Sequence, residues 1–261
     1  MISETIGKRP PVSPNVSLDP PISFRDLGVV PYDAALSVQR ELNEAVIAGS
    51  AEPTVLLVEH PAVITLTRRA GPNLLADGDR LVELGISTAE TDRGGDITYH
   101  GPGQLVVYPI LKLGAFGLNL SSYMRLLERV VIQTIGRWGI VGHNECGATG
   151  VWVGSETADA AVSSAKICAM GVRIRKNTTI HGLALNVAPD LSHFGLIVPC
   201  GLDRPVTSMA ALLGAGCPSM GAVKAELIER LSSGLAGDSD ASVDAGGGCA
   251  SGSRPGTSAG T

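Results

Sequence analysis

The chain has 261 residues, 44% of them hydrophobic, which is enough for the core of one large domain or two small ones. Its formal net charge of -5 and pI near 5.5 argue against nonspecific binding to nucleic acid, which relies on a basic surface. No apolar run approaches the roughly 20 residues of a membrane span, and the first residues lack the apolar core of a signal peptide, so a cytoplasmic protein is expected.

Both ends of the chain differ in composition from the middle. Residues 1–22 carry five prolines and little apolar content, which predicts a flexible N-terminal segment. Residues 232–261 consist mostly of Gly, Ser, Ala and Asp and cannot bury enough surface to offset their ordering entropy, which predicts a disordered tail. Residues 23–231 are therefore predicted to form a single folded domain.

The first elements of this domain are a helix and two short strands. Apolar residues at helical spacing predict an amphipathic helix over residues 32–48, and Gly49 follows as a C-terminal stop. Residues 54–58 and 62–67 are rich in Val, Ile and Thr on either side of a break at Pro61. This pattern predicts two strands that pair with each other.

The next elements alternate in the same way. Residues 104–110 predict a strand, and a helix capped by Asn119 or Ser121 follows and ends at Gly139. Three strands and a closing helix are then predicted over residues 149–153, 165–174, 179–187 and 219–231. The last two strands join at Lys176 and Asn177 in hairpin fashion. Because several strands lie too close together for parallel crossovers, the predicted fold class is α/β (α+β) with a mixed, largely antiparallel sheet and flanking helices.

The five cysteines are Cys146, Cys168, Cys200, Cys217 and Cys249. Their number is odd and no CxxC pair occurs, so the sequence suggests neither a disulfide framework nor a zinc ribbon, and reduced thiols are expected. His143 and Cys146 have an H-x-x-C spacing, but no second pair of ligands accompanies them, so no metal site is predicted.

Cys200 stands between Pro199 and Gly201, just after a short apolar run. Pro199 has a fixed φ angle, and Gly201 lets a ligand come close to the main chain. This context therefore suits a rigid turn that presents a reactive sulfur. A buried thiol that acts as a small hydrophobe explains the same residues equally well. The local sequence leaves both interpretations open, because environment decides thiol reactivity.

Residues 93–104 form a glycine-rich stretch with a polar centre. It matches neither phosphate-binding glycine motif. A hairpin would account for its four glycines and leave Arg93, Tyr99 and His100 unexplained. Long polar side chains on such a loop favour contacts with a ligand.

Lys166 lies in a strand whose two faces are both mostly apolar, so its side chain either snorkels from the strand end or is desolvated. Beside a thiol, this amine could raise the thiolate fraction as a cation or accept the proton as a neutral base. Strand alternation places Cys168 on the same face, which makes it the rival nucleophile. Cys168 ranks below Cys200 because the flanking Ile167 and Met170 leave less room for a substrate.

Four segments carry a family resemblance: RGGDITYHGPGQ at 93–104, KICAMGVRI at 166–174, HGLALNV at 181–187 and IVPCG at 197–201. Together they resemble the octanoyltransferases of lipoate biosynthesis, the lipoyl(octanoyl) transferases. Segments LGVVPY at 27–32 and LLVEHPAVITL at 56–66 extend the resemblance to about residues 25–215. Thr67 and Cys168 depart from the family pattern, in which a glycine and a small residue such as alanine are usual.

The resemblance implies a fold and a set of site residues. The fold is the cofactor-transferase domain shared with lipoate-protein and biotin-protein ligases. Cys200 is implied as the acyl-thioester nucleophile and Lys166 as the group that tunes its pKa. The implied substrate-binding residues are Arg93, Gly94, Gly95, Asp96, Ile97, Thr98, Tyr99, His100, Ala169, Met170, Gly171, Gly182, Leu183 and Ala184.

The implied activity is transfer of an octanoyl or lipoyl group from acyl carrier protein to a lysine of a lipoyl domain, the first step of endogenous protein lipoylation. The implied acceptors are lipoyl domains of 2-oxoacid dehydrogenase complexes and the glycine cleavage H protein. No cofactor, metal or ATP is expected. Six residues are available for a basic surface toward an acidic carrier: Arg68, Arg69, Arg93, Arg173, Arg175 and Lys176.

Three questions stay open at this point. His100 and His181 could assist proton movement, or could satisfy hydrogen bonds within the core. An ATP-dependent ligase of the lipoate or biotin type is one alternative function, although adenylation needs no thiol such as Cys200. A domain that binds acyl carrier or lipoyl domains without turnover is the other.

Overall fold

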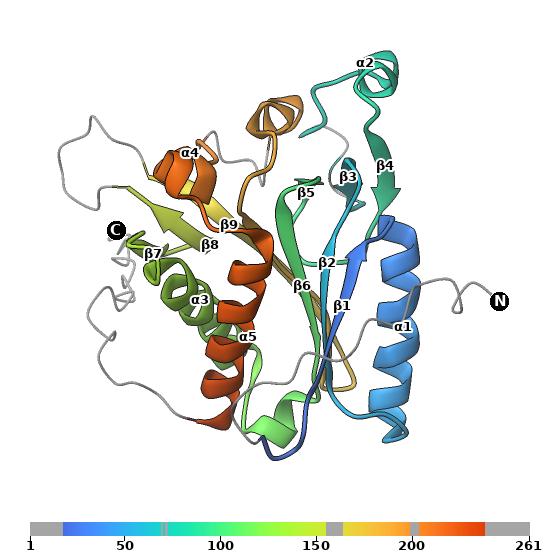
Figure 1. Cartoon of the computed structure of the whole chain (residues 1–261). Helices are drawn as coiled ribbons and strands as arrows, with labels where there is room; N and C mark the ends of the chain where they lie inside the picture. Colours follow the sequence, from blue (N-terminus) through green and yellow to red (C-terminus); the bar gives the residue numbers. More distant parts are fainter. Residues whose placement is uncertain (1–17, 69, 71–72, 155–163, 199–203, 238–261) are drawn as a thin grey trace, which may run out of the picture.

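The structure is a computed structural model of the chain, and it describes residues 18–68, 70, 73–154, 164–198 and 204–237. The described part is built on a seven-stranded sheet with helices on both faces (Figure 1). In order across this sheet the strands are β1 (Ser23–Val29), β2 (Thr54–Glu59), β6 (Gln104–Ile110), β10 (Thr178–Asn186), β9 (Ala165–Arg175), β8 (Ala148–Val153) and β7 (Gly142–Glu145). β1 and β2 are parallel and the other neighbouring pairs are antiparallel, which confirms the predicted fold class.

Three long helices cover the sheet. They are α1 (Tyr32–Ala48) on one face, and α3 (Leu120–Gly136) with α5 (Met220–Ala236) on the other (Figure 1). α1 ends at Gly49, as predicted, because glycine takes the left-handed φ of 74° without strain. α3 begins at Asn119, whose side chain accepts a hydrogen bond from the Ser122 N–H, as expected of an N-terminal cap.

The central strands are buried on both faces. Successive residues along β2 and β6 alternate between two apolar clusters because strand side chains point to opposite faces. Leu57 and Val107 pack in the cluster under α3 and α5, whereas Leu56 and Val106 pack in the cluster under α1. Both faces of these strands are thus fixed by packing, and their register is strongly determined.

The hairpin between β9 and β10 forms at the predicted residues. Lys176 and Asn177 have φ values of 46° and 61°, the two positive values that a two-residue type I′ turn requires. The register that follows places Gly182 opposite Gly171 and Leu183 opposite Met170. The segments 166–174 and 181–187, which both carry the family resemblance, therefore lie on neighbouring strands of the sheet.

The predicted pairing of residues 54–58 with 62–67 is wrong. β2 lies between β1 and β6, while β3 (Val63–Leu66) belongs to a second sheet between β4 (Ser87–Glu90) and β5 (Ile97–His100). A fully buried strand such as β2 needs partners on both edges, and more distant strands supply them. β5 also shows that the glycine-rich stretch 93–104, described above as a loop, contains a strand.

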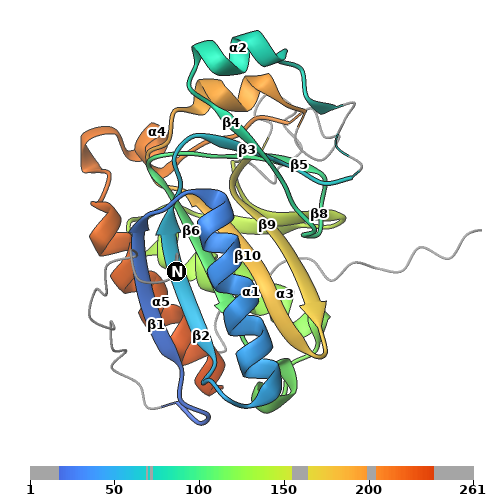
Figure 2. The same ribbon diagram turned by 90° about the vertical axis from the view of Figure 1, so that its right-hand side faces the viewer.

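The smaller sheet lies above the larger one, with α2 (Gly78–Glu83) beyond it (Figure 2). Its core joins Ile64, Ile97 and Tyr99 to Phe194 of the 3-10 segment η3 (Leu191–Leu196). The described residues also include three short helical segments: η2 (Leu113–Phe116), α4 (Met209–Leu213) and η5 (Gly214–Gly216).

Two predicted boundaries of the domain differ from the structure. α5 continues to Ala236 rather than Leu231, because Ser232 and Leu235 are buried against the domain. This helix takes in the first five residues of the segment predicted as a tail. At the other end, Leu18 and Ile22 pack against the main core cluster, so the end of the predicted flexible segment contributes to packing.

Within the described ranges, no helix combines the length and apolarity that crossing a bilayer requires. Among the same residues, no group of three or more His, Cys, Asp or Glu side chains gathers in a way that could hold a metal ion.

Candidate active site

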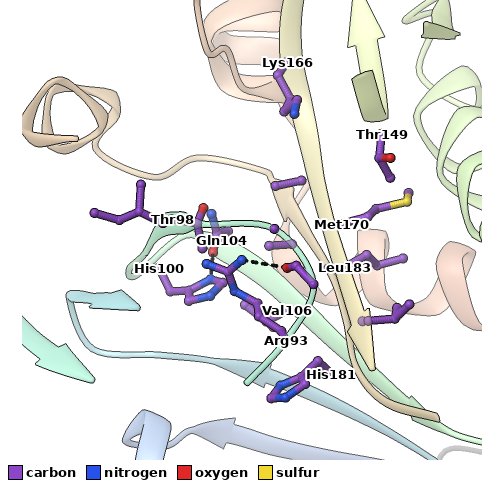
Figure 3. A pocket seen from close by; sticks show the side chains of 18 of the residues that line it. Arg93, Thr98, His100, Gln104, Val106, Thr149, Lys166, Met170, His181 and Leu183 are labelled. Carbon is purple, nitrogen blue, oxygen red and sulfur yellow. Dashed lines mark hydrogen bonds between the residues drawn. The ribbon is translucent and has the colours of Figure 1, made fainter. Parts of the chain in front are cut away.

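A cavity of about 420 Å³ opens between the two sheets and is lined by segments that lie far apart in the sequence. Residues predicted to bind substrate line it from the glycine-rich stretch and from β9 and β10: Arg93, Gly94, Gly95, Ile97, Thr98, His100, Ala169, Met170, Gly171, Gly182, Leu183 and Ala184. Lys166 lines the same cavity, at the opposite end from His181 in the view of Figure 3. A pocket of this size is typical of small-molecule sites.

Two predicted substrate-binding residues do not line this pocket. Asp96 accepts a hydrogen bond from the Asn73 side chain. Tyr99 is buried in the core of the smaller sheet, and its hydroxyl lies 2.8 Å from His193 Nδ1. Tyr99 points away from the face of β5 that carries Thr98 and His100, and it packs in the same core cluster as Ile97. Cys200 lies outside the described residues.

Close backbone contacts hold the glycine-rich stretch against β9. The Gly94 N–H donates to the Val172 carbonyl at 3.1 Å. A Cβ at Gly171 would lie only 2.6 Å from the Gly94 oxygen, and one at Gly182 only 2.1 Å from the Val107 oxygen. Glycine at these two positions therefore lets the pocket walls approach each other, which any larger residue would prevent.

Lys166 is the second residue of β9, and its backbone bonds to the segment that holds Pro205 and Thr207. Its N–H donates to the Pro205 carbonyl at 2.9 Å, and its carbonyl accepts from the Thr207 N–H at 3.0 Å. Its ammonium lies 4.6 Å from the centroid of the Trp152 ring. Lys166 is half-buried and lines the pocket, so its side chain meets the cavity rather than open solvent.

The rival thiol, Cys168, is fully buried in the main core cluster and does not line the pocket. Burial raises the pKa of its thiol to about 12, so almost none is ionised at neutral pH. Cys168 and Cys217 are free thiols, as predicted. Cys146 is disulfide-bonded, and the prediction of reduced cysteines is wrong for this residue, because spacing along the chain does not reveal which thiols meet in space.

Two histidines next to the pocket are held by hydrogen bonds within the core. His60 donates from Nδ1 to the Val30 carbonyl at 2.6 Å and accepts at Nε2 from the Tyr108 hydroxyl at 2.8 Å. His100 donates from Nδ1 to the Gln104 side-chain oxygen at 2.7 Å. Burial lowers the pKa of His60 to about 4 and that of His100 to about 3. His100 is thus neutral at pH 7, which favours the core hydrogen-bond alternative.

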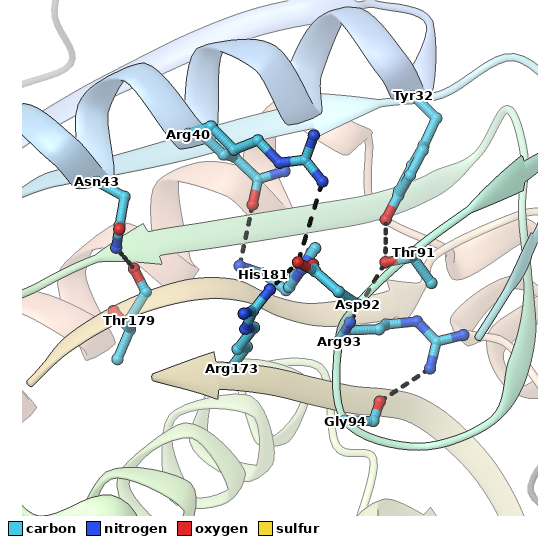
Figure 4. Close-up of polar contacts among 11 residues, drawn as sticks. Tyr32, Arg40, Asn43, Thr91, Asp92, Arg93, Gly94, Arg173, Thr179 and His181 are labelled. Carbon is cyan, nitrogen blue, oxygen red and sulfur yellow. Dashed lines mark hydrogen bonds and ion pairs between the residues drawn. The ribbon is translucent and has the colours of Figure 1, made fainter. Parts of the chain in front are cut away.

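His181 donates from Nε2 to Asp92 at 2.9 Å and has a left-handed φ of 63°, unusual for a residue with a side chain (Figure 4). Burial, and then the positive charges of three arginines, lower the pKa of His181 to about 3. His181 is therefore also uncharged at neutral pH.

These buried histidines predict a loss of stability in acid. The unfolded chain binds protons at its histidines from the ordinary pKa of 6.5 downward, whereas folded His60 resists protonation until about pH 4. The free energy of unfolding should therefore fall between pH 6.5 and 4, by up to about 3 kcal/mol for His60 alone. Urea unfolding midpoints across this range measure the slope. His60→Gln should flatten it, and an unchanged slope would contradict the assignment.

Two of the six cations predicted to form a basic surface are paired with carboxylates. Arg173 forms an ion pair with Asp92, and Arg175 forms one with Glu44. Arg93 donates to the Gly94 carbonyl at 2.9 Å, which folds its side chain back on its own segment (Figure 4). Arg69 lies outside the described residues. The local field is therefore weaker than a count of six cations suggests.

Comparison with known proteins places this chain in a family. Residues 31–232 match the family described as the lipoyl protein ligase A/B catalytic domain. The chain is 46% identical over 208 residues to an octanoyltransferase of Chloroflexus aurantiacus, covering 78% of this chain and 90% of that protein. It is 49% identical over 190 residues to one of Solibacter usitatus, covering 72% and 82%. This chain belongs to the octanoyltransferase family. It is thus an acyltransferase, as the resemblance indicated.

Solved structures show the same fold at low sequence identity. A bipartite lipoate protein ligase of Thermoplasma acidophilum matches with a TM-score of 0.61 at 16% identity, over 81% of this chain and 82% of that one. A lipoate-protein ligase A bound with ATP matches with a TM-score of 0.59 at 17% identity, over 79% and 83%. This chain therefore has the lipoate-ligase type of fold that the resemblance predicted.

Several residues that line the pocket were not predicted. They are Tyr32, Gln104, Val106, Tyr108, Met124, Gly147, Ala148, Thr149, Val172, Asn186, Phe194 and Val206. Most are apolar or small, and nothing local distinguishes them from ordinary core positions. Gln104 did carry a signal, because a polar residue that opens an otherwise apolar strand needs a buried partner.

The contact between Gly171 and Gly94 gives a test of the pocket. Gly171→Ala should displace residues 93–95 from β9 and raise the KM for the acyl donor about tenfold, because small displacements of binding groups are costly. Gly195→Ala is the matched control, since a Cβ there meets no atom within 4 Å. Equal kinetics of the two variants would show that this contact does not shape the substrate site.

Proposed function

We propose that this protein transfers an octanoyl group from acyl carrier protein to a lysine of a lipoyl domain, through a thioester on Cys200. The observation that carries this proposal is the shared pocket: the Lys166 amine and the three predicted acyl-binding segments line one cavity. Val206, six positions after Cys200, forms a parallel bridge with Lys166, which supports a joint role for the two. Lipoyl transfer by the same route is part of the proposal.

The lining of the pocket supports an apolar acyl chain as its occupant. Val106, Met124, Met170 and Leu183 supply aliphatic or thioether surface from four different elements. Burying an eight-carbon chain is worth at most about 5 kcal/mol at roughly 0.8 kcal/mol per methylene. This energy favours octanoyl over much shorter groups, but separates neighbours of similar length only weakly.

In the first half-reaction, the Cys200 thiolate attacks the carbonyl carbon of the octanoyl thioester. A new thioester to Cys200 forms, the bond to the carrier's phosphopantetheine sulfur breaks, and that sulfur leaves as a thiol. Lys166 takes the proton from the attacking thiol and returns one to the leaving sulfur.

In the second half-reaction, a neutral lysine amine of the acceptor attacks the Cys200 thioester. An amide bond forms, the carbon–sulfur bond breaks, and Cys200 is regenerated while Lys166 accepts a proton from the incoming amine. The acceptors are lipoyl domains of 2-oxoacid dehydrogenase complexes and the glycine cleavage H protein. No ATP is needed, because an acyl thioester is already activated.

Donor specificity tests this proposal against an ATP-dependent ligase. The protein is incubated with a lipoyl domain and either octanoyl acyl carrier protein without ATP, or free octanoate with ATP. Product with the carrier alone supports the proposal. Product only with octanoate and ATP overturns it in favour of a ligase.

Intact-protein mass spectrometry separates transfer from simple binding. After mixing with octanoyl acyl carrier protein in the presence of a mild reductant, we expect a mass gain of one octanoyl group, mapped to Cys200. A protein that binds the carrier without gaining this mass would be a binding module.

A further inference from the structure

Lys166 lies directly across the sheet from Trp152. The register of β8 and β9 pairs these two residues next to an irregularity between Val151 and Trp152. Trp152 is 1% exposed, and its ring Nε1–H donates to the Ala148 carbonyl at 2.8 Å, which fixes the orientation of the indole. The Lys166 amine therefore rests 4.6 Å from the centroid of an immobile aromatic ring.

A second cation lies against the same indole. The Arg204 guanidinium carbon is 4.5 Å from the Trp152 ring centroid. Arg204 forms an ion pair with Glu145 of β7. The Glu145 carboxylate also accepts a hydrogen bond from the Ser164 hydroxyl. Since both cations lie within 4.6 Å of one centroid, they are no more than about 9 Å apart.

Two cations so close repel each other, and only one of them can lose its proton. The arginine guanidinium does not deprotonate in proteins, whereas a lysine ammonium does so readily when its environment disfavours charge. The indole face attracts both cations, and Glu145 offsets part of the charge of Arg204. The repulsion that remains between the two cations shifts the protonation equilibrium of Lys166 toward the neutral amine.

Other groups also face Lys166. Glu128 of α3 accepts a hydrogen bond from the Gly150 N–H at 3.3 Å, and the Lys166 Cε would lie 3.5 Å from a Cβ at Gly150. His143 lies 3.4 Å from Glu145, and the buried Cys168 thiol follows on the same strand. Residues 199–203, which include Cys200 and Asp203, lie outside the described residues. A direct titration of the Lys166 amine therefore measures the combined effect of all these groups on its proton affinity.

We propose that Trp152 positions the Lys166 amine at the end of the pocket and that Arg204, resting on the same indole, weakens the hold of that amine on its proton. Arg204 and Trp152 are thus positioning residues that act through Lys166. This inference rests on the proposed function in one respect: the neutral amine is the form that takes a proton from the attacking thiol or the acceptor lysine.

Competitive labelling of the full chain with trace acetic anhydride, quantified by peptide mass spectrometry from pH 6 to 11, measures the proton affinity of Lys166 without turnover. Lys176, exposed at the hairpin turn, is the internal reference. We expect Lys166 to titrate below Lys176. Arg204→Gln should raise the pKa of Lys166 by about half a unit to one unit. Arg204→Lys keeps the positive charge, so the pKa of Lys166 in this variant should stay close to its value in the unmodified chain.

Two further variants sharpen the test. Glu145→Gln removes the anion that offsets Arg204 and should lower the pKa of Lys166, opposite in sign to Arg204→Gln. Arg230→Gln on α5, where Arg230 pairs with Glu226, is the matched control and should change nothing. The inference is overturned if Lys166 titrates with Lys176, or if Arg204→Gln leaves its titration unchanged.

The pH dependence of kcat/KM gives a second readout that a purely structural role would not move. The acid limb should shift upward in Arg204→Gln by the same amount as the labelling curve. The inference about Arg204 and the proposed function can fail separately. Full transfer by Lys166→Met would contradict the role of Lys166 in the proposed function. The labelling result would still show whether Arg204 changes the proton affinity of this amine.

Discussion

Replacing Cys200 by serine is expected to lower octanoyl transfer about a thousandfold or more, and to abolish the mass gain with octanoyl acyl carrier protein. A hydroxyl at its free pKa is a far weaker nucleophile than a thiol that ionises in part at neutral pH. Steady-state transfer to a lipoyl domain, measured with a mild reductant present because Cys146 is disulfide-bonded, checks the rate.

Cys168→Ala is the matched control for this substitution. Cys168 is buried in the core, burial raises the pKa of its thiol to about 12, and it does not line the pocket. Its loss should therefore leave most of the transfer activity and remove only a small amount of packing. If Cys168→Ala abolished transfer while Cys200→Ser retained it, the assignment of the nucleophile would be wrong.

Replacing Lys166 by methionine is expected to lower kcat/KM for transfer about 10² to 10⁴ fold, the usual contribution of a positioned acid or base. Methionine keeps an unbranched side chain of similar reach, so the pocket wall and the stem contacts with Trp152 remain while the amine is lost. The acid limb of the pH profile should also disappear, because the titrating group is gone.

Lys112→Met is the control, since Lys112 is exposed just after β6 and does not line the pocket. It should transfer at the rate of the unmodified chain. Transfer by Lys166→Met within a few-fold of that rate would show that another group moves the proton.

Local sequence patterns predicted those elements whose structure depends on residues close to one another in the chain. The apolar spacing of α1 and its stop at Gly49, and the hairpin at Lys176 and Asn177, follow from side-chain periodicity and from φ preferences. These depend on neighbours within one or two turns of the chain. The sequence was therefore enough to define these elements.

Strand pairing was not predictable in the same way. β2 and β3 are neighbours in sequence, yet they belong to different sheets. Their apolar patterns are equally good strand patterns, and the choice of partner depends on burial of both edges by distant segments. The disulfide at Cys146 was missed for the same reason, because it depends on proximity in space.

The sequence by itself determined the family and the chemical candidates, because the motifs around Arg93, Lys166, His181 and Cys200 are short runs in which each residue type is informative. Only the tertiary structure decided which of these residues share a cavity, that Asp96 and Tyr99 face elsewhere, and that Cys168 is buried in the core. It alone placed Arg204 on the indole that supports Lys166. The physical reason is that contact, burial and electric field depend on distances between segments, and separation along the chain does not fix those distances.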